Sequence, residues 1–201
     1  MGDFESTNKR ISNIISEENK NLLKIYQSLI FLLKGTPYLL YGDELEFKTG
    51  EKFMKWDKTQ NCGFSKNSTV LNSNCEKNVK LQKATGAGKT LTRLYKSMSE
   101  LRNEPSFQWG RIEFIKKEEN LIGFIREAEG FESYLIAANI GIETKNVDFK
   151  HFFDLKNEKG NVSYFFSLEN NNQEFSVDSE IFLDNILLKF GELLVVKFTR
   201  I

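Results

Sequence analysis

The hydrophobic pattern first predicts an amphipathic helix. Apolar side chains recur on one helical face at Leu22, Tyr26, Leu29 and Leu33. Ser16 is a favourable start because its hydroxyl can cap exposed backbone amides. Gly35 followed by Pro37 is typical of a helix end, since proline cannot continue the helix. The spacing therefore predicts a helix over residues 16–34 with one broad buried face.

A short apolar run at residues 38–41 follows this helix, and a Gly-Asp-Glu triplet at residues 42–44 closes it. Such a run predicts a strand that is buried on both faces, as in a parallel sheet covered by helices. A helix, a tight turn and a buried strand that ends in carboxylates are typical of a (β/α)8 barrel. Residues 46–88 are polar and predict a long loop, and helical spacing predicts a second helix over residues 89–103.

After Pro105 the apolar positions alternate, as they do in strands. Short alternating segments separated by turns predict strands over residues 112–115, 121–126, 131–139, 162–167, 180–188 and 193–199. Together they predict an all-β, antiparallel β-sandwich. The expected fold class is α/β plus all-β, with residues 1–104 as the C-terminal part of a TIM (β/α)8 barrel and residues 105–201 as the sandwich domain.

Composition narrows the possible functions. The 201 residues include 28 basic and 28 acidic side chains, and 40% of them are hydrophobic. This balance excludes a disordered chain and argues against nucleic-acid binding, which needs a basic excess. The longest strongly apolar stretch, residues 28–33, is far shorter than the roughly 20 residues that span a bilayer, and no signal peptide is expected. The single histidine, His151, excludes a His-rich metal site and is expected to be half-buried. We expect no metal and no cofactor.

Residues 85–90, Thr-Gly-Ala-Gly-Lys-Thr, resemble the end of a phosphate-binding loop. However, Lys83 stands where that motif has its leading glycine, and the preceding segment is polar and contains no buried strand. We therefore predict that this loop binds no nucleotide.

Asp43 and Glu44 are adjacent carboxylates at the end of the expected strand. Neighbouring side chains of an extended segment point to opposite faces, so these two cannot flank one bond as an acid/base pair. A structural or capping role is favoured over a catalytic one.

Cys62 and Cys75 are the only cysteines, and their spacing fits neither a redox CxxC motif nor a zinc site. They are either free thiols or one small disulfide loop formed in an oxidising compartment. Asn67 and Asn161 head N-glycosylation sequons, but about two are expected by chance in so asparagine-rich a chain, so they carry little weight.

Three segments resemble the α-amylase/α-glucosidase superfamily. Residues 35–44, Gly-Thr-Pro-Tyr-Leu-Leu-Tyr-Gly-Asp-Glu, resemble its eighth barrel strand. Residues 54–57 (Met-Lys-Trp-Asp) and 61–65 (Asn-Cys-Gly-Phe-Ser) resemble the M-x-W-D and N-A-G-F-S loop of its oligosaccharide-hydrolase branch, and residues 94–102 resemble its last barrel helix. The resemblance implies the C-terminal third of such a protein, with the nucleophile Asp and the acid/base Glu on earlier strands.

The superfamily's strand-seven motif, G-N-H-D, falls at Gly2-Asp3-Phe4-Glu5. Phe4 cannot donate a hydrogen bond to a sugar hydroxyl, and Glu5 is one methylene longer than the Asp that stabilises the transition state. The resemblance therefore implies a degenerate site, with no confident catalytic residue among Asp3, Phe4 and Glu5.

Residues 22–27, Phe31 and residues 35–37 are also similar to the heavy subunits of heteromeric amino-acid transporters. Those are type II membrane glycoproteins that keep the glycosidase scaffold without its activity. The resemblance implies a non-catalytic ectodomain at the extracellular face of the plasma membrane, with the single membrane segment outside this chain. It also implies a membrane-embedded light subunit as the partner, whose trafficking it aids. Cys62 and Cys75 are expected to pair if the protein is extracellular.

The alternative is part of a retaining α-glucosidase that cleaves α-glucosidic bonds in carbohydrate metabolism. Its mechanism would use a carboxylate nucleophile and a carboxylic general acid. A membrane span upstream would favour the transporter subunit, and an intact Asp/Glu pair upstream would favour the hydrolase.

Overall fold

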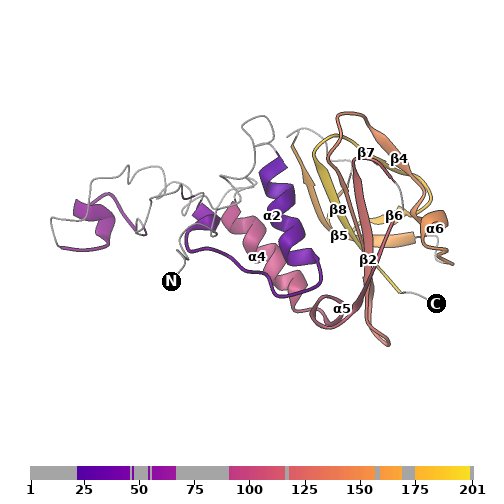
Figure 1. The fold of residues 1–201 in the computed structure, drawn as a ribbon, viewed down its shortest axis with the longest axis horizontal. Helices are drawn as coiled ribbons and strands as arrows, with labels where there is room; N and C mark the ends of the chain where they lie inside the picture. Colours follow the sequence, from indigo (N-terminus) through magenta and orange to yellow (C-terminus); the bar gives the residue numbers. More distant parts are fainter. Residues whose placement is uncertain are drawn as a thin grey trace, which may run out of the picture. The chain divides into compact units, whose positions relative to one another are not determined.

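The computed structural model describes residues 22–45, 47, 54, 56–66, 91–115, 118–156, 159–168 and 175–199, and the larger of the two sheets among these residues is antiparallel. The six strands of this sheet lie in the order β1-β2-β3-β8-β5-β6. Figure 1 labels β2, β8, β5 and β6 among them. Their bounds are β1 Arg111–Phe114, β2 Leu121–Glu127, β3 Ser133–Asn139, β8 Glu192–Phe198, β5 Lys159–Ser167 and β6 Glu180–Phe182. A second sheet pairs β4 (Lys145–Val147) with β7 (Ile186–Leu188).

Strand β3 lies between β2 and β8, and all seven of its residues are buried. Its Leu135 is in register with Ile125 of β2 and Val196 of β8. These three side chains belong to one apolar cluster with the small sheet, to which that sheet contributes Val147, Ile186 and Leu188. This apolar core therefore lies between the large and the small sheet.

The described helices are α2 (Leu23–Leu32), α4 (Leu91–Arg102), α5 (Pro105–Gln108) and α6 (Phe149–Phe152). The described residues of segments 24–37 and 97–199 form one compact unit, and those of segments 22–23 and 38–96 form another. Helix α2, from Lys24 onward, thus packs with the large sheet. The expected domain division into residues 1–104 and 105–201 stays a prediction.

Helix α2 crosses the large sheet from β5 to β2. Near its start, the Lys24 ammonium lies 5.8 Å from the centre of the Phe166 ring of β5. At its end, Arg126 of β2 donates from Nη1 to the carbonyl of Leu32 at 3.1 Å. These contacts place α2 against the face of the sheet that carries Arg126 and Phe166.

Two arginines bind the C-terminal end of α2. The last carbonyl groups of a helix have no partner within it, and the helix dipole makes that end negative. Arg102 donates from Nη1 to the carbonyls of Phe31 and Leu33, both at 2.8 Å, and from Nη2 to that of Gly35. These bonds and the bond from Arg126 to the carbonyl of Leu32 supply hydrogen-bond donors to the last carbonyls of α2. Both arginines also bring positive charge to the negative end of the helix dipole.

Arg126 is completely buried. Its Nη2 also donates to the carbonyl of Phe107 at 2.8 Å, and its guanidinium carbon lies 5.5 Å from the centre of the Phe107 ring. Burial, and secondarily the positive charge of Arg102, lower the pKa of Arg126 to about 10. Arg126 therefore stays charged at neutral pH and joins β2 to the ends of α2 and α5.

The second buried side chain beside Arg126 is its cross-strand neighbour Tyr134. The Tyr134 ring centre lies 4.9 Å from that of Phe107. Burial, followed by the charge of Glu104 and a hydrogen bond to its carboxylate, raises the pKa of Tyr134. The tyrosine hydroxyl is therefore held in its neutral, donating form at this face of the sheet.

The sequence predictions for helices and most strands are confirmed within the described residues. The helices expected over residues 16–34 and 89–103 are α2 and α4, with residues 16–21, 89 and 90 outside the described parts. The antiparallel pairing after Pro105 is confirmed. The single strand expected over residues 180–188 is wrong, because β6 and β7 are separate strands that pair in different sheets.

Two further expectations need correction. Residues 38–41 form no strand, and the side chains of Tyr38 and Tyr41 are exposed. A buried parallel strand needs flanking strands, and none of the described residues pairs with this segment. His151 is exposed rather than half-buried, because it lies in α6, where its backbone amide donates to the carboxylate of Asp148 at 2.8 Å.

We predict that Arg126→Met lowers the free energy of unfolding by about 2–4 kcal/mol, because it leaves the buried carbonyls of Leu32 and Phe107 without donors. Urea denaturation of the chain measures this. Lys159→Met is the control, since Lys159 forms an exposed ion pair with Glu180, and we expect it to cost less than about 1 kcal/mol. Equal losses in the two variants would contradict the role assigned to Arg126.

Candidate functional site

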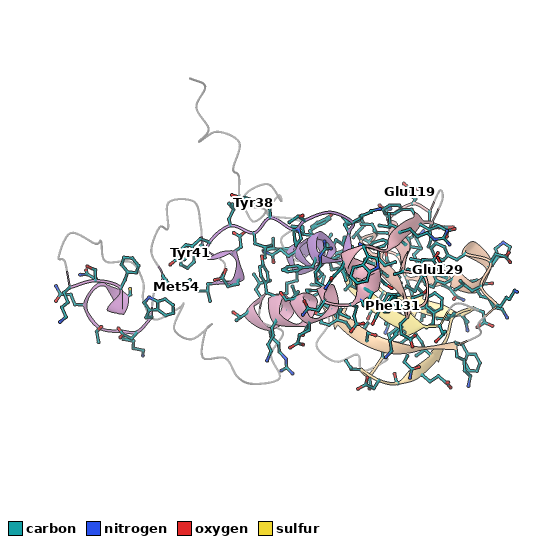
Figure 2. All side chains as sticks on the ribbon, turned by 90° about the horizontal axis from the view of Figure 1, so that it is seen from below. Tyr38, Tyr41, Met54, Glu119, Glu129 and Phe131 are labelled. Atoms are coloured by element: carbon teal, nitrogen blue, oxygen red, sulfur yellow. The ribbon has the colours of Figure 1, made fainter. Side chains whose placement is uncertain are left out.

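Tyr41 connects the segment at residues 35–44 to the loop that contains Met54. The Tyr41 hydroxyl accepts a hydrogen bond from the backbone amide of Met54 at 3.1 Å, and Figure 2 shows the two residues side by side. The Tyr41 ring also meets the ring of Phe47 edge-on, with centres 6.0 Å apart. Leu45, Phe47 and Met54 form a small buried cluster. The Tyr41 side chain thus fixes the start of the M-x-W-D loop.

The position after Tyr41 is occupied by Gly42, and a larger residue would not fit there. Its φ is +84°, a left-handed conformation that side chains disfavour, and a Cβ there would lie 2.3 Å from the Phe47 ring. The Tyr-Gly pair in the strand-eight motif therefore has a packing explanation.

Asp43 is engaged in local backbone capping. Its Oδ2 accepts a hydrogen bond from the backbone amide of Leu40 at 3.1 Å, where the short helix η3 (Asp43–Leu45) begins. The carbonyl of Glu44 accepts a hydrogen bond from the Thr92 hydroxyl at 3.1 Å. The Asp43 contact agrees with the structural role expected for that carboxylate, whereas the Glu44 contact uses its backbone.

The loop at residues 56–65 is closed by the carbonyl of Cys62. That carbonyl accepts hydrogen bonds from the backbone amides of Trp56 at 2.8 Å and Asp57 at 3.2 Å. The Asp57 carboxylate accepts a hydrogen bond from the Thr59 amide at 2.8 Å, which turns the chain within the loop. The aspartate of the M-x-W-D motif is therefore used to fold the loop.

Three consecutive left-handed residues, Asn61, Cys62 and Gly63, complete this loop. Asparagine tolerates that conformation better than most residues, and the Asn61 side-chain amide donates to the carbonyl of Ser65 at 2.9 Å. A Cβ at Gly63 would lie 2.6–2.8 Å from the Asp57 carboxylate. The residues Asp57, Asn61 and Gly63 of the motif thus each have a folding role.

Several predicted site residues fall outside the described parts of the structure. These are Asp3, Phe4, Glu5, Asn67, Cys75 and the glycine-rich residues 85–90. Cys62 is buried and disulfide-bonded, and Cys75 is the only other cysteine in the sequence. Asn161 is exposed in β5, in register with Glu180 of β6 and Lys197 of β8.

The described residues bring together no group of three or more His, Cys, Asp or Glu side chains that could hold a metal ion. No helix among them is long and apolar enough to cross a bilayer. Within the described parts of the motif segments, residues 56–65 form a folded loop. The aromatic side chains of Tyr38 and Trp56 are 75% and 57% exposed.

Sequence reasoning missed Arg126 as a structural residue. No role was predicted for this charged residue at the end of the alternating segment 121–126, yet Arg126 is buried because α2 and α5 cover that face of the sheet. The available signal was the apolar character of both faces of this strand, since Phe124 and Ile125 are both buried.

Comparison with curated proteins finds amino acid transporter heavy chains. The chain is 27% identical over 132 residues to the amino acid transporter heavy chain SLC3A2 of Oryctolagus cuniculus, covering 61% of this chain and 23% of that protein. It is 32% identical over 126 residues to the SLC3A2 heavy chain of Rattus norvegicus, covering 58% of this chain and 23% of that protein. The resemblance to transporter heavy chains is confirmed. The chain spans less than a quarter of the length of these relatives, and no protein-family model matches it.

Solved structures of trehalulose synthase are similar to this chain in fold. A trehalulose synthase MutB variant in complex with Tris matches with a TM-score of 0.65 and 15% identity, over 94% of this chain and 41% of that one. Trehalulose synthase MutB from Pseudomonas mesoacidophila matches with a TM-score of 0.59 and 16% identity, over 88% and 38% of the two chains. The expected combination of helices with an antiparallel sheet is therefore confirmed, whereas the barrel and the sandwich stay predictions.

We predict that Gly63→Ala opens the loop at residues 56–65, because the new methyl group must displace the Asp57 carboxylate. Cys62 should then be reduced and alkylated faster under mild dithiothreitol, as followed by intact mass. Gly130→Ala is the matched control, since Gly130 has a similar positive φ but open space around its Cβ position. Strain alone costs roughly 1 kcal/mol at either site, so equal alkylation rates in both variants would contradict the steric explanation.

We also predict that Cys62 and Cys75 are linked in secreted material. Closing a loop of about 14 residues contributes roughly 3 kcal/mol in the chain-entropy model, so Cys62→Ser should lower the free energy of unfolding by about that amount. Non-reducing peptide mapping measures the link directly. Recovery of both cysteines in alkylated form without reduction would contradict it.

Proposed function

We propose that this chain belongs to the ectodomain of a heavy subunit of an amino-acid transporter and acts as a non-catalytic scaffold. The observation that carries the proposal is the sequence similarity to SLC3A2 heavy chains over about three fifths of the chain. In this proposal α2, α4 and the segment between them correspond to the last elements of a (β/α)8 barrel, followed by the β domain. A membrane-embedded light subunit is the partner, and the scaffold aids its trafficking.

The use of the motif carboxylates supports a scaffold role. Asp43 caps the backbone at Leu40, and Asp57 folds its own loop, so neither is positioned as a general acid or nucleophile by these contacts. The sequence at the strand-seven position points the same way, since Phe4 lacks a polar group and Glu5 is longer than the family's aspartate. Catalysis by an oxocarbenium-type transition state needs carboxylates held to within about half an ångström.

The disulfide chemistry supports an extracellular location. Disulfides persist in oxidising compartments and are rare in the cytosol, and Cys62 is disulfide-bonded. In this proposal the parent is a single-pass type II membrane protein whose membrane segment lies elsewhere in its sequence. Asn161, which is exposed on β5, is then an accessible glycan acceptor, and Asn67 is a second candidate.

A retaining α-glucosidase is the second candidate, because residues 35–44, 54–57 and 61–65 resemble motifs of the α-amylase/α-glucosidase superfamily. The structural neighbours include trehalulose synthase and an isomaltulose synthase variant from Erwinia rhapontici in complex with D-glucose, the latter with a TM-score of 0.60 and 15% identity. Identity this low supports the fold alone. The two candidates differ in whether the parent hydrolyses α-glucosidic bonds.

We predict that the full-length parent shows no hydrolysis of maltose-type substrates and raises amino-acid uptake only when a light subunit is co-expressed. The reason is that Phe4 and Glu5 both weaken transition-state stabilisation at the strand-seven position. Uptake of labelled amino acids and glucose release are measured on the same cells. Glu5→Gln is the informative variant, because it removes the carboxylate and should leave uptake unchanged.

Hydrolysis that disappears in Glu5→Gln, without any partner-dependent uptake, would establish the glucosidase and overturn the scaffold proposal. Partner-dependent uptake that is unaffected by Glu5→Gln would support the scaffold. Surface biotinylation of the light subunit, with and without the parent, separates a trafficking role from a direct role in transport.

A further inference from the structure

Strand β1 forms one edge of the six-stranded sheet. Within the described residues it pairs with β2, and no strand lies on its other side. Three of its four residues, Arg111, Glu113 and Phe114, are exposed. An open edge presents backbone amides and carbonyls that can pair with a strand of another chain. This edge is therefore a candidate interaction surface.

The backbone groups of alternate residues in β1 point away from β2. The amide of Ile115 donates to the carbonyl of Gly123 at 2.8 Å, so these two residues form a hydrogen-bonded pair that continues the ladder. Hydrogen-bonded and non-hydrogen-bonded pairs alternate along antiparallel strands. The residues at even spacing from Ile115 therefore bond to β2, and the two between them, Ile112 and Phe114, present their amides and carbonyls to the open edge.

The charges of β1 make it complementary to a second copy of itself. Arg111 and Glu113 are two positions apart, so both side chains lie on the same face of the strand. Opposite charges that face each other across an antiparallel pair stabilise it, and like charges destabilise it. Strand β6, at the other edge of the sheet, has one charged residue, Glu180, and could offer a second copy of itself only the same charge.

Three registers of two β1 strands place their outward-facing residues opposite each other. Pairing Ile112 with Phe114 of the second copy puts the two Glu113 side chains face to face. Pairing Phe114 with Phe114 places each Glu113 opposite the apolar Ile115. Pairing Ile112 with Ile112 places each Arg111 opposite a Glu113. This last register alone joins opposite charges on both sides of the two-fold axis.

We propose that two copies of this chain associate through β1, with the strands antiparallel and Ile112 opposite Ile112, so that the large sheet continues from one copy into the other. Backbone hydrogen bonds between the two isoleucines and two pairs of Arg111 with Glu113 hold the strands together. Arg111 also donates from Nε to Glu127 of its own chain, and its side chain is 71% exposed. Its guanidinium group has five donors and can serve both carboxylates.

The exposed aromatic side chains beside β1 support this interface. Trp109 is 59% exposed and Phe131 is 51% exposed, and their ring centres lie 6.1 Å apart near the start of β1. Phe114, at the end of β1, is 50% exposed. Antiparallel pairing brings the start of one β1 beside the end of the other, so the aromatic pair of each copy approaches Phe114 of the other. Aromatic residues are enriched in protein interfaces.

The position of Trp109 at this edge is fixed by Arg126. The carbonyls of Phe107 and Gly110, on either side of Trp109, accept hydrogen bonds from Arg126 at 2.8 and 3.4 Å. The amide of Trp109 donates to the carbonyl of Pro105 at 3.1 Å and ends α5. A preorganised aromatic surface loses little conformational entropy on association.

This interface does not rest on the proposed function. It is formed by β1 and its neighbours and needs neither a light subunit nor a catalytic site. A failure of self-association would leave the scaffold proposal and the glucosidase alternative unchanged, and a failure of uptake or hydrolysis would leave the interface unchanged.

Sedimentation of the full 201-residue chain over a range of concentrations measures self-association. A short strand from each copy forms a small interface, so we expect a weak dimer with a Kd on the order of 100 μM. Glu113→Arg turns both ion pairs into like-charge pairs and should weaken the dimer at least about tenfold. Glu180→Arg, on β6 at the opposite edge of the sheet, is the matched control and should leave the dimer unchanged.

A mixture of two variants tests the charge complementarity directly. Chains with Arg111→Glu carry two acidic residues on β1, and chains with Glu113→Arg carry two basic ones. Each variant alone should stay monomeric, whereas the mixture should form a heterodimer. Thermal unfolding shows whether Arg111→Glu still folds, since the Arg111 side chain is bonded to that of Glu127, which is 10% exposed.

Engineered thiols report the register independently of the charge variants. Hydrogen-bonded partners in an antiparallel ladder have Cα atoms about 5.5 Å apart, which is within disulfide range. Ile112→Cys should therefore give a disulfide-linked dimer under mild oxidation, identified by peptide mapping. Phe114→Cys should not, because in this register the two positions lie roughly 14 Å apart along the strands.

A linked dimer in Ile112→Cys but not in Phe114→Cys, together with a heterodimer from the charge mixture, would support the interface. A chain that stays monomeric at millimolar concentration and gives no linked dimer in Ile112→Cys would overturn it. A dimer that Glu113→Arg does not weaken would also overturn it, because the contact would then lie on another surface. Equally fast linking in Phe114→Cys would contradict the register.

Discussion

The packing of helices against the large sheet depends on how the C-terminal end of α2 is satisfied. Helix carbonyls at that position must find donors, and in this protein water does not supply them all, because Arg126 is fully buried where it reaches Leu32. The sheet supplies Arg126 and α4 supplies Arg102. Because guanidinium groups present several donors in one plane, two side chains serve the carbonyls of residues 31–33 and 35, and Arg126 also serves Phe107.

This arrangement also determines where the segment with the family resemblance begins. The carbonyl of Gly35 is bound by Arg102, so the chain leaves α2 from a fixed point before residues 38–44. Tyr41 and Gly42 then organise the next turn, and Asp57 and Gly63 organise the loop beyond it. The motif residues that the structure describes are thus explained by folding, which is why a chain can keep them whether or not the parent retains catalytic activity.

How far the sequence predicted the fold depended on whether the signal was local. Strands β2, β3 and β8 were predicted from the alternation of apolar positions after Pro105, and α2 because its apolar stripe repeats at helical spacing. Strand β4 was missed because Lys145-Asn146-Val147 offers a single apolar side chain, and its pairing with β7 comes from distant sequence. Segment 180–188 was read as one strand because nothing local shows that the backbone carbonyl of Leu183 receives the amides of Phe149 and Lys150.

The candidate sites were also difficult to predict from the local sequence. Residues 38–41 have the composition of a buried strand, yet strand hydrogen bonds are made with other strands, so composition cannot say whether partners are present. The roles of Asp57 and Gly63 could be foreseen only as a motif, because the contact between them depends on three left-handed residues in succession. Trp109 and Phe131 are 22 positions apart and carry no joint signal in the sequence. They meet because α5 ends where the turn between β2 and β3 lies, and that position is fixed by the bonds of Arg126 to the carbonyls of Phe107 and Gly110. Arg126, which the sequence analysis did not single out, therefore organises both the end of α2 and the exposed aromatic edge.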